Sequence, residues 1–358
     1  MEIGLSKSSK KEFWSGKRVV LTGHTGFKGA WMALWLSRLG AQVTGISLAP
    51  EAQPNLFELA NINSITHSHF CDIRDSESLS SLMKLVRPEI IFHFAAQSLV
   101  RAGYTDPLAT FSTNIQGTAN ILDSLRTLET ARVAVVITTD KVYRNLEQQY
   151  PFRETDELGG HDPYSASKAA AEIVIASYRD SYLKEAGIAV ASARAGNVIG
   201  GGDWAENRLI PDAIRAWQMG RSLEVRRPHA IRPWQHVLEP LAAYIKLAER
   251  LWVSPSYSSA FNFGPMTHEA ATVQEVVLQA KDAYGMGRVV WGNSAVGPHE
   301  AGWLALETAK ARRMLGLEPR WPLFEAVRRT IYWYKRLHEG SDARELCCQD
   351  IADYEEVL

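Results

Sequence analysis

Short apolar runs alternate with amphipathic stretches along the first half of the chain. Residues 17–22 are rich in Val and Leu and have the length of a buried strand, whereas residues 30–39 repeat large apolar side chains at helical spacing. The alternation continues, and it predicts strands at 41–48, 68–72, 89–94 and 133–138 and helices at 76–86 and 108–128. Continuous apolar strands that alternate with helices are typical of a parallel sheet covered on both faces. Ligands of such sheets bind at the carboxyl ends of the strands.

The pattern changes after residue 200. A glycine run at 200–202 predicts a loop, and Pro, Trp and Arg become frequent in residues 226–236. We therefore expect an α/β fold with a doubly wound parallel sheet of the Rossmann type at residues 17–200. A smaller C-terminal α/β substrate domain, interleaved with the first, is expected at residues 201–340.

Composition narrows the class of protein. Of 358 residues, 39 are basic and 40 acidic, which argues against a nucleic-acid partner or a polybasic membrane patch. No apolar run approaches the roughly 20 residues that span a bilayer, so no membrane partner is expected. Three cysteines, two of them adjacent, form no disulfide framework, so we expect a cytoplasmic protein. No His, Cys or Asp cluster has metal-ligand spacing, and we predict no metal.

A glycine pattern joins the first predicted strand to the first predicted helix. Gly23 allows a tight turn, Gly26 lets the backbone approach a pyrophosphate, and Gly29 permits close packing of helix on sheet. His24 and Lys28 could neutralise phosphate oxygens, and Phe27 belongs to the same predicted contact. The spacing is G-x-x-G-x-x-G, and a purely structural turn is the alternative. The pattern and its context predict a dinucleotide site.

Further predicted cofactor contacts follow the next strands. The second strand ends without an Asp or Glu for the ribose, so the loop leaves NAD and NADP open. Asp72 could accept a hydrogen bond from the adenine amino group, and a turn cap is an equal alternative. Small side chains at Ala95 and Ala96 would let the backbone pass close to the cofactor. The remaining predicted cofactor contacts are Ile73, Asn114 and Thr138.

Tyr164 and Lys168 are spaced four residues apart on a predicted helix. They therefore project from one face. A nearby ammonium lowers the pKa of a phenol and makes it a usable base. Thr139 follows a predicted strand at the edge where ligands bind and can share the hydrogen bond to a sugar hydroxyl. These three residues would take a proton while a hydride leaves for a nicotinamide. Chance pairing on an amphipathic helix is the alternative.

Asp140 and Lys141 extend the predicted chemistry beyond oxidation. An elimination needs one group that removes a proton beside a ketone and another that protonates the departing hydroxyl. Asp140 suits the acid, and Lys141 could be the base. The alternative is an exposed ion pair that merely ends a strand.

The motifs together resemble those of the extended short-chain dehydrogenase/reductases. The glycine loop, Thr139-Asp140-Lys141 and the Tyr164–Lys168 pair are similar to those of the nucleotide-sugar 4,6-dehydratases over residues 17–335. The loop form, Lys141 where most relatives carry Glu, and Pro298-His299-Glu300-Ala301 resemble the CDP-glucose branch. The resemblance implies bound NAD, oxidation at C4 of a nucleotide-diphosphate hexose, loss of water across C5 and C6, and hydride return to C6. It also implies a homodimer or homotetramer and a setting in surface-polysaccharide precursor synthesis.

The same resemblance implies the substrate contacts. Segments 194–197 and 207–211 resemble those that line the sugar nucleotide, and Arg232 resembles the arginine that binds the diphosphate. An exposed surface charge is the alternative for each arginine. The resemblance favours a substrate contact for Arg232 and Asn207, and Arg208 and Arg227 are even choices. The implied substrate-binding residues are Gln97, Ser98, Arg194, Asn197, Asn207, Arg208, Leu209, Arg232 and His299.

Two other functions remain open at this point. A nucleotide-sugar 4-epimerase would use Tyr164 without the Asp140–Lys141 pair. A non-catalytic NAD(P)-binding protein would need neither. Lys141 leaves the identity of the C5 base open, because an ammonium must first lose its proton and could instead stabilise an enolate.

Overall fold

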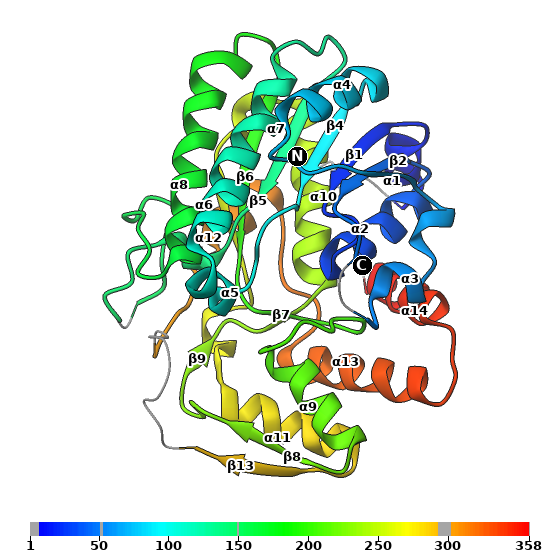
Figure 1. Ribbon diagram of the computed structural model, residues 1–358, viewed down its shortest axis with the longest axis vertical. Coiled ribbons are helices and arrows are strands. Elements are labelled where there is room, and N and C mark those ends of the chain that lie inside the picture. The colour runs from blue at the N-terminus through cyan, green and yellow to red at the C-terminus, as the bar shows by residue number, and fades with distance from the viewer. Residues whose placement is uncertain (1–6, 51–52, 149, 293–301, 358) are drawn as a thin grey trace.

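A seven-stranded parallel sheet lies at the centre of the molecule (Figure 1). The computed structural model describes residues 7–50, 53–148, 150–292 and 302–357. Neighbouring strands pair in the order β11-β6-β5-β4-β1-β2-β3, all in parallel. The strands are β1 (Arg18–Thr22), β2 (Gln42–Ser47), β3 (His67–Phe70), β4 (Ile90–His93), β5 (Val133–Ile137), β6 (Ala189–Ala195) and β11 (Ala260–Phe263). The predicted strands and the doubly wound sheet are confirmed.

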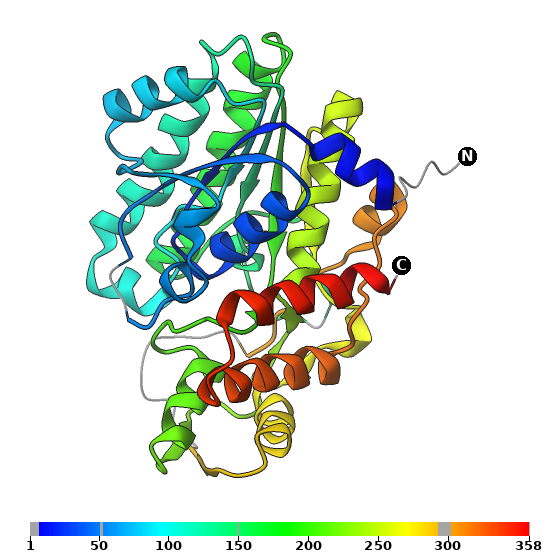
Figure 2. The same cartoon turned by 90° about the vertical axis from the view of Figure 1, so that its right-hand side faces the viewer.

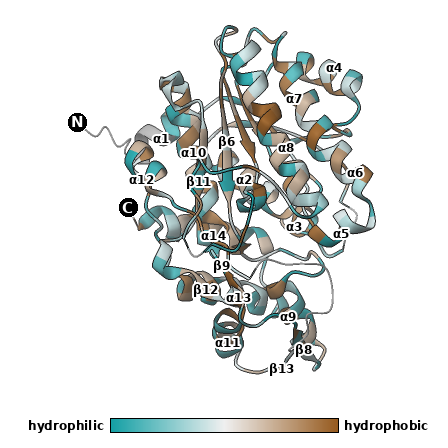
Figure 3. Cartoon of the chain, turned by 90° about the vertical axis from the view of Figure 1, so that its left-hand side faces the viewer, coloured by the Kyte–Doolittle hydropathy of each residue, from teal (hydrophilic) through white to brown (hydrophobic). Residues whose placement is uncertain are grey.

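Side-chain alternation along the strands divides the core between the two faces of the sheet. Val19 and Leu21 belong to one buried cluster and Val20 to another, as expected for successive residues of a strand. Helices cover both faces, and Figure 3 shows β6 between them coloured mainly hydrophobic. The covering helices are α2 (Phe27–Arg38) and α10 (Leu238–Val253) on one face, and α4 (Ser76–Val86), α7 (Gly117–Leu125) and α8 (Pro163–Tyr178) on the other.

The helix predicted at 108–128 is interrupted. It comprises α6 (Pro107–Phe111), a π-helical turn (Ser112–Gln116) and α7, and it ends at Leu125. Asn114 on this turn is buried and bonds to the loop that follows β4. Apolar spacing does not report a π turn, which commonly occurs at functional sites.

A smaller part of the molecule lies below the sheet in Figure 1. Its elements are α9 (Leu209–Gln218), β8 (Ser222–Val225), α11 (Val273–Tyr284), β13 (Arg288–Trp291) and α13 (Leu323–His338), with the two-residue strands β7 (Val198–Ile199), β9 (Ile231–Arg232), β10 (Gln235–His236) and β12 (Ala271–Thr272). The chain after residue 200 also supplies strand β11 to the large sheet and helix α10 to one of its faces. The division at residues 200 and 201 remains a prediction.

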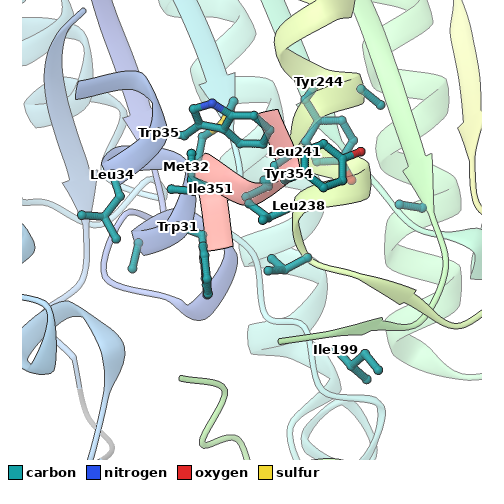
Figure 4. Close-up of a cluster of buried hydrophobic side chains, with 14 of the residues drawn as sticks. Trp31, Met32, Leu34, Trp35, Ile199, Leu238, Leu241, Tyr244, Ile351 and Tyr354 are labelled. Atoms are coloured by element: carbon teal, nitrogen blue, oxygen red, sulfur yellow. The ribbon is translucent and has the colours of Figure 1, made fainter. Parts of the chain in front are cut away.

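The C-terminal helix α14 (Ala343–Glu356) returns to the larger part and lies beside α13 (Figure 2). Figure 4 shows its Ile351 and Tyr354 among side chains of α2 and α10, including Trp31 and Trp35. This packing fixes the smaller part against the sheet. The remaining helices are α1 (Lys7–Trp14), α3 (Leu56–Leu59), α5 (Val100–Thr105) and α12 (Ala309–Leu315).

Candidate active site

Two adjoining cavities open at the carboxyl ends of the central strands. The first has a volume of about 340 Å³ and runs from the end of β5 to β8 and α9. The second has a volume of about 890 Å³ and is lined mainly by residues of segments 98–105, which includes helix α5, 141–146 and 157–162. Residues shared by both include Ser98, Lys141, Asn197, Asn207, Arg208, Arg226 and Arg232. The site therefore lies where the sheet topology predicts a ligand.

Tyr164 and Lys168 lie on α8, whose first turn is capped by the Asp162 side chain. Both are buried, and Lys168 Nζ donates to the carbonyl of Ile137 at 2.8 Å. Burial raises the pKa of Tyr164 to about 12, although a hydrogen bond with Thr139 and the charge of Arg208 oppose the rise. The lowered phenol pKa that we expected is therefore not found, because desolvation outweighs the nearby positive charge.

Asp140 and Lys141 form a short 3₁₀ turn directly after β5. Asp140 is 1% exposed, and its Oδ1 accepts from Thr139 Oγ1 at 2.9 Å and from Lys141 Nζ at 3.0 Å. Its Oδ2 is buried without a hydrogen-bond partner in the described part of the chain. Gly196 leaves room for this oxygen, since a Cβ there would lie 3.2 Å from it. The ion pair that was the alternative is therefore present, but its carboxylate is buried and lines the first cavity instead of lying exposed at the end of a strand.

The glycine loop has the close packing that a dinucleotide cradle requires. Gly23 has φ +76°, and a Cβ there would lie 2.8 Å from the amide nitrogen of Ala95. A Cβ on Gly29 would lie 2.0 Å from the carbonyl oxygen of Gly23. Gly26 is the N-cap of α2 and has no side chain to bond the first-turn amides, which suits an anion at this helix end. These residues fit the pyrophosphate of a dinucleotide.

His24 corrects one of our expectations. It is buried against Phe57, bonds to Ser68 Oγ at 3.0 Å through Nε2, and occupies the space that Gly45 leaves on β2. Burial lowers its pKa to about 4, so the ring is neutral at neutral pH and cannot neutralise a phosphate.

Lys28, in contrast, lines the first cavity together with Phe27. Burial and the charges of Arg208 and Lys168 lower the pKa of Lys28 to about 7. The charge of Lys28 therefore interacts with charged groups at the catalytic end of the cavity. Its amine is about half protonated near neutral pH.

The other predicted cofactor contacts lie around the same strand ends. Asp72 accepts from Arg74 in an ion pair of 2.6 Å and also from the amide of Arg74, so the turn cap that we kept as an alternative is present. Asn114 bonds to the backbone of Gln97 and to Ser167 of α8. The residues that pack beside these strand ends are Ile73, Ala95, Ala96 and Thr138. Their contact with a cofactor stays a prediction.

Predicted substrate residues reach the cavities from both parts of the molecule. Arg208 bonds to buried Asp203 at 2.8 Å and to Ser98, and Arg101 bonds to Asn207 at 3.1 Å. The Arg208–Ser98 and Arg101–Asn207 pairs connect the segment after β4, which includes α5, to the start of α9. Cavity-lining residues from the predicted set are Ser98, Asn197, Asn207, Arg208, Leu209 and Arg232. Asn197 Oδ1 is buried and has no partner among the described residues.

Arg194 is a second correction. It lines neither cavity, because Glu172 pairs with it at 2.8 Å inside the core behind the site. Gln97 also bonds within the protein, to Thr110 and to the amide of Leu99. We therefore reassign both from substrate contact to support of the site. His299 lies outside the described residues.

Several residues were missed by the sequence reasoning. Arg226 lines both cavities, Asp203 holds Arg208, and Gly196 makes space for Asp140. Glu172 lies one helical turn after Lys168, a spacing that could have identified it. Within the described residues, no His, Cys, Asp or Glu group could hold a metal, and no helix is long and apolar enough to cross a membrane.

Two known proteins are similar to this chain over most of its length. The chain is 44% identical over 350 residues to a CDP-glucose 4,6-dehydratase of Salmonella typhimurium, across 96% of this chain and 98% of the relative. It is 26% identical over 329 residues to a dTDP-glucose 4,6-dehydratase of Xanthomonas campestris, across 88% of this chain and 92% of the relative.

Solved structures of lower identity share the fold. A dTDP-glucose 4,6-dehydratase of Bacillus anthracis in complex with NAD has a TM-score of 0.76 at 22% identity, covering 90% of this chain and 98% of that one. A UDP-glucose 4-epimerase of Thermotoga maritima with UDP-glucose has a TM-score of 0.77 at 20% identity, covering 89% and 99%.

A family model described as GDP-mannose 4,6 dehydratase matches residues 20–330, which include the glycine loop, the Asp140–Lys141 pair and the Tyr164 helix. This chain belongs to the GDP-mannose 4,6 dehydratase family.

Proposed function

We propose that this chain converts CDP-D-glucose to CDP-4-dehydro-6-deoxy-D-glucose and water, with NAD as a resident cofactor. The observation that carries the proposal is the convergence of Tyr164, Asp140 and Lys141 on the first cavity. An epimerase needs only the tyrosine part of this set. The relative that acts on CDP-glucose, at 44% identity over nearly the whole chain, supports the choice of substrate.

NAD, when bound, supplies a hydride acceptor for C4, a hydride donor for C6 and a positive charge near the reacting groups. Gly23, Gly26 and Gly29 would hold its pyrophosphate, and Lys168 its nicotinamide ribose. The protein residues supply the proton chemistry. Tyr164 Oη takes the proton of the C4 hydroxyl, while Thr139 Oγ1 orients that hydroxyl. Lys168, as an ammonium, stabilises the phenolate form of Tyr164 that accepts this proton.

The elimination uses the turn after β5. A proton on Asp140 Oδ2, the carboxylate oxygen that has no partner in the described part of the chain, is transferred to the departing C6 hydroxyl. Lys141 lies 3.0 Å from the other oxygen and faces both cavities. Transfer of the Lys141 proton to the Asp140 carboxyl group within this pair leaves a neutral amine, which then removes the C5 proton. As an ammonium, Lys141 would instead stabilise the enolate. The burial of Asp140 excludes bulk water from the acid.

The arginines around the cavity junction suit the substrate diphosphate. Arg232 and Arg226 line both cavities, at the point where the catalytic end meets the end formed by β8 and α9. Guanidinium groups bind phosphate oxygens in paired hydrogen bonds. The nucleoside would then extend toward Leu223 and Val225, and the hexose toward Tyr164.

The test is a product analysis. Purified protein with NAD and CDP-glucose is expected to give the 4-keto-6-deoxy sugar, identified by mass and nuclear magnetic resonance, without net release of NADH. Recovery of the C4 epimer with its C6 hydroxyl retained would select the epimerase instead. No product from folded protein that binds NAD would reject both.

We also propose that the protein acts in the cytoplasm and assembles as a homo-oligomer. Cys71, Cys347 and Cys348 are free thiols, as suits a reducing cytoplasm. Exposed Leu108 and Ile173 lie on the adjacent helices α6 and α8, which suits a helical interface in a homodimer or homotetramer. The product is a precursor of the kind used in surface-polysaccharide synthesis. Analytical ultracentrifugation tests the assembly, and an L108E/I173E variant should dissociate it.

A further inference from the structure

Glu172 is a buried acid that the proposed chemistry does not use. It lies on α8 four residues after Lys168, so the two side chains project from the same helix face. Its side chain is 4% exposed and lines neither cavity. A carboxylate at this depth is costly unless donors surround it.

Three donors surround the Glu172 carboxylate. Thr138 Oγ1 donates to Oε1 at 2.5 Å, Ser192 Oγ donates to Oε2 at 2.7 Å, and Arg194 Nη2 donates to Oε2 at 2.8 Å. Both oxygens therefore act as acceptors. Burial alone would raise the pKa of Glu172. The charge of Arg194, its hydrogen bond and those of Thr138 and Ser192 together outweigh burial, so the pKa is lowered. The side chain is an anion held inside the core.

The partners of Arg194 fix this anion in place. Arg194 Nη1 donates to Tyr143 Oη at 2.9 Å, and Tyr143 Oη donates to Asn262 Oδ1 at 2.6 Å. The chain of contacts connects α8, β6 and β11 with the segment that follows Lys141. A shift of Glu172 would therefore disturb several elements at once.

Lys168 has one anionic neighbour that opposes its deprotonation. Burial lowers the pKa of Lys168 to about 8, and Glu172 raises it. The other titratable groups facing Lys168 are Lys28 from α2, whose burial lowers its pKa to about 7, and His93 from β4, whose burial lowers its pKa to about 3. Both are mainly neutral above pH 7, so neither adds a positive charge that would repel the Lys168 ammonium.

We propose that Glu172 is a positioning residue that keeps Lys168 protonated and anchors Thr138 beside the catalytic Thr139. The inference rests on the proposed function, in which the Lys168 ammonium supports the Tyr164 phenolate and the cofactor ribose. A purely structural ion pair would join α8 to β6 without setting the charge of Lys168.

The experiment measures NAD affinity against pH by quenching of tryptophan fluorescence, with no sugar nucleotide present. Affinity should fall as Lys168 loses its proton, because the neutral amine is a weaker hydrogen-bond donor to the ribose. In Glu172→Gln, which keeps the shape and removes the charge, the midpoint of this fall should move down by about one pH unit or more. Glu172→Asp keeps the charge, and its midpoint should lie close to the wild-type pH.

Glu249→Gln is the matched control, since Glu249 is equally buried but lies on α10 beside Trp14. It should lose stability without moving the midpoint. If Glu172→Gln does not fold because Arg194 is left unpaired, the double variant Glu172→Gln/Arg194→Gln removes both charges. It should still shift the midpoint downward, by less than the single variant, because the more distant Arg194 cation is lost as well. A wild-type midpoint in a folded charge-free variant, or an equal shift in Glu249→Gln, overturns the inference. Failure of the dehydratase function would appear separately, as wild-type protein that binds NAD but gives no product from CDP-glucose.

Discussion

Replacing Asp140 by Asn should separate the elimination from the oxidation. Asp140 is 1% exposed, and its Oδ1 accepts hydrogen bonds at 2.9 and 3.0 Å, which an Asn oxygen can also accept. The Asn amide cannot carry an acidic proton in place of Oδ2. A positioned general acid contributes roughly 10²–10⁴-fold to rate. Product formation should therefore fall by about 10²–10⁴-fold, or about 2.7–5.4 kcal/mol in the barrier.

The assay follows both steps in one experiment. Rapid mixing with CDP-glucose should make the near-ultraviolet absorbance of reduced nicotinamide rise and persist in Asp140→Asn, because C4 is oxidised but water is not lost. In wild-type protein the absorbance should be transient. Asp203→Asn is the comparison variant, because Asp203 lines the same cavity and holds Arg208. It should weaken substrate binding and slow both steps together.

Two results would refute the reasoning about Asp140. Product formation in Asp140→Asn at a rate close to that of the wild type would show that the acid lies elsewhere. Equal loss of the absorbance change and of the product would show that Asp140 acts in the oxidation or in binding.

Three further predictions concern the rest of the site. Tyr164→Phe should lower product formation by about 10²–10⁴-fold and abolish the absorbance change, while NAD still binds; an unchanged rate would exclude the phenol as the base. Gly29→Ala should weaken NAD binding by roughly tenfold or more, because its Cβ would meet the Gly23 carbonyl at 2.0 Å; Gly264→Ala, where no atom lies closer than 3.9 Å, should bind NAD normally in the same titration. Burial lowers the pKa values of Lys28 and Lys168 to about 7 and about 8, from the ordinary lysine value of 10.5. Between these lowered values and 10.5, the native state therefore holds fewer protons than the unfolded state. The free energy of unfolding should therefore rise with pH across that window, by up to about 1.4 kcal/mol per pH unit for each group, and Lys28→Met should remove one of the two contributions in urea titrations; an unchanged slope would contradict the lowered pKa of Lys28.

The order of strands and helices could be predicted because burial imposes a visible pattern. The β1 and β5 strands are covered on both faces, so their residues form continuous apolar runs. The π turn at Ser112–Gln116 could not be predicted, because it keeps the apolar spacing of a helix while Asn114 turns to the loop after β4. Local spacing carries no information about that contact.

The candidate site likewise contains some residues whose role could be predicted from the sequence and others whose role could not. Residues whose role follows from their place at a strand end, such as Asp140, line the cavity as expected. Residues whose role depends on what surrounds them were misjudged. His24 is held neutral by packing against Phe57, and Arg194 points into the core because Glu172 neutralises it there. Burial and pairing of charges arise only from tertiary structure.

The central claim is that one bound hexose is oxidised at C4 and reduced at C6 within the same site. CDP-glucose labelled with deuterium at C4 tests it most directly. The account predicts a 4-keto-6-deoxy product that carries the deuterium at C6, with no net NADH. Deuterium retained at C4 of an epimer that keeps its C6 hydroxyl, or a keto product whose C6 lacks the label, would contradict it.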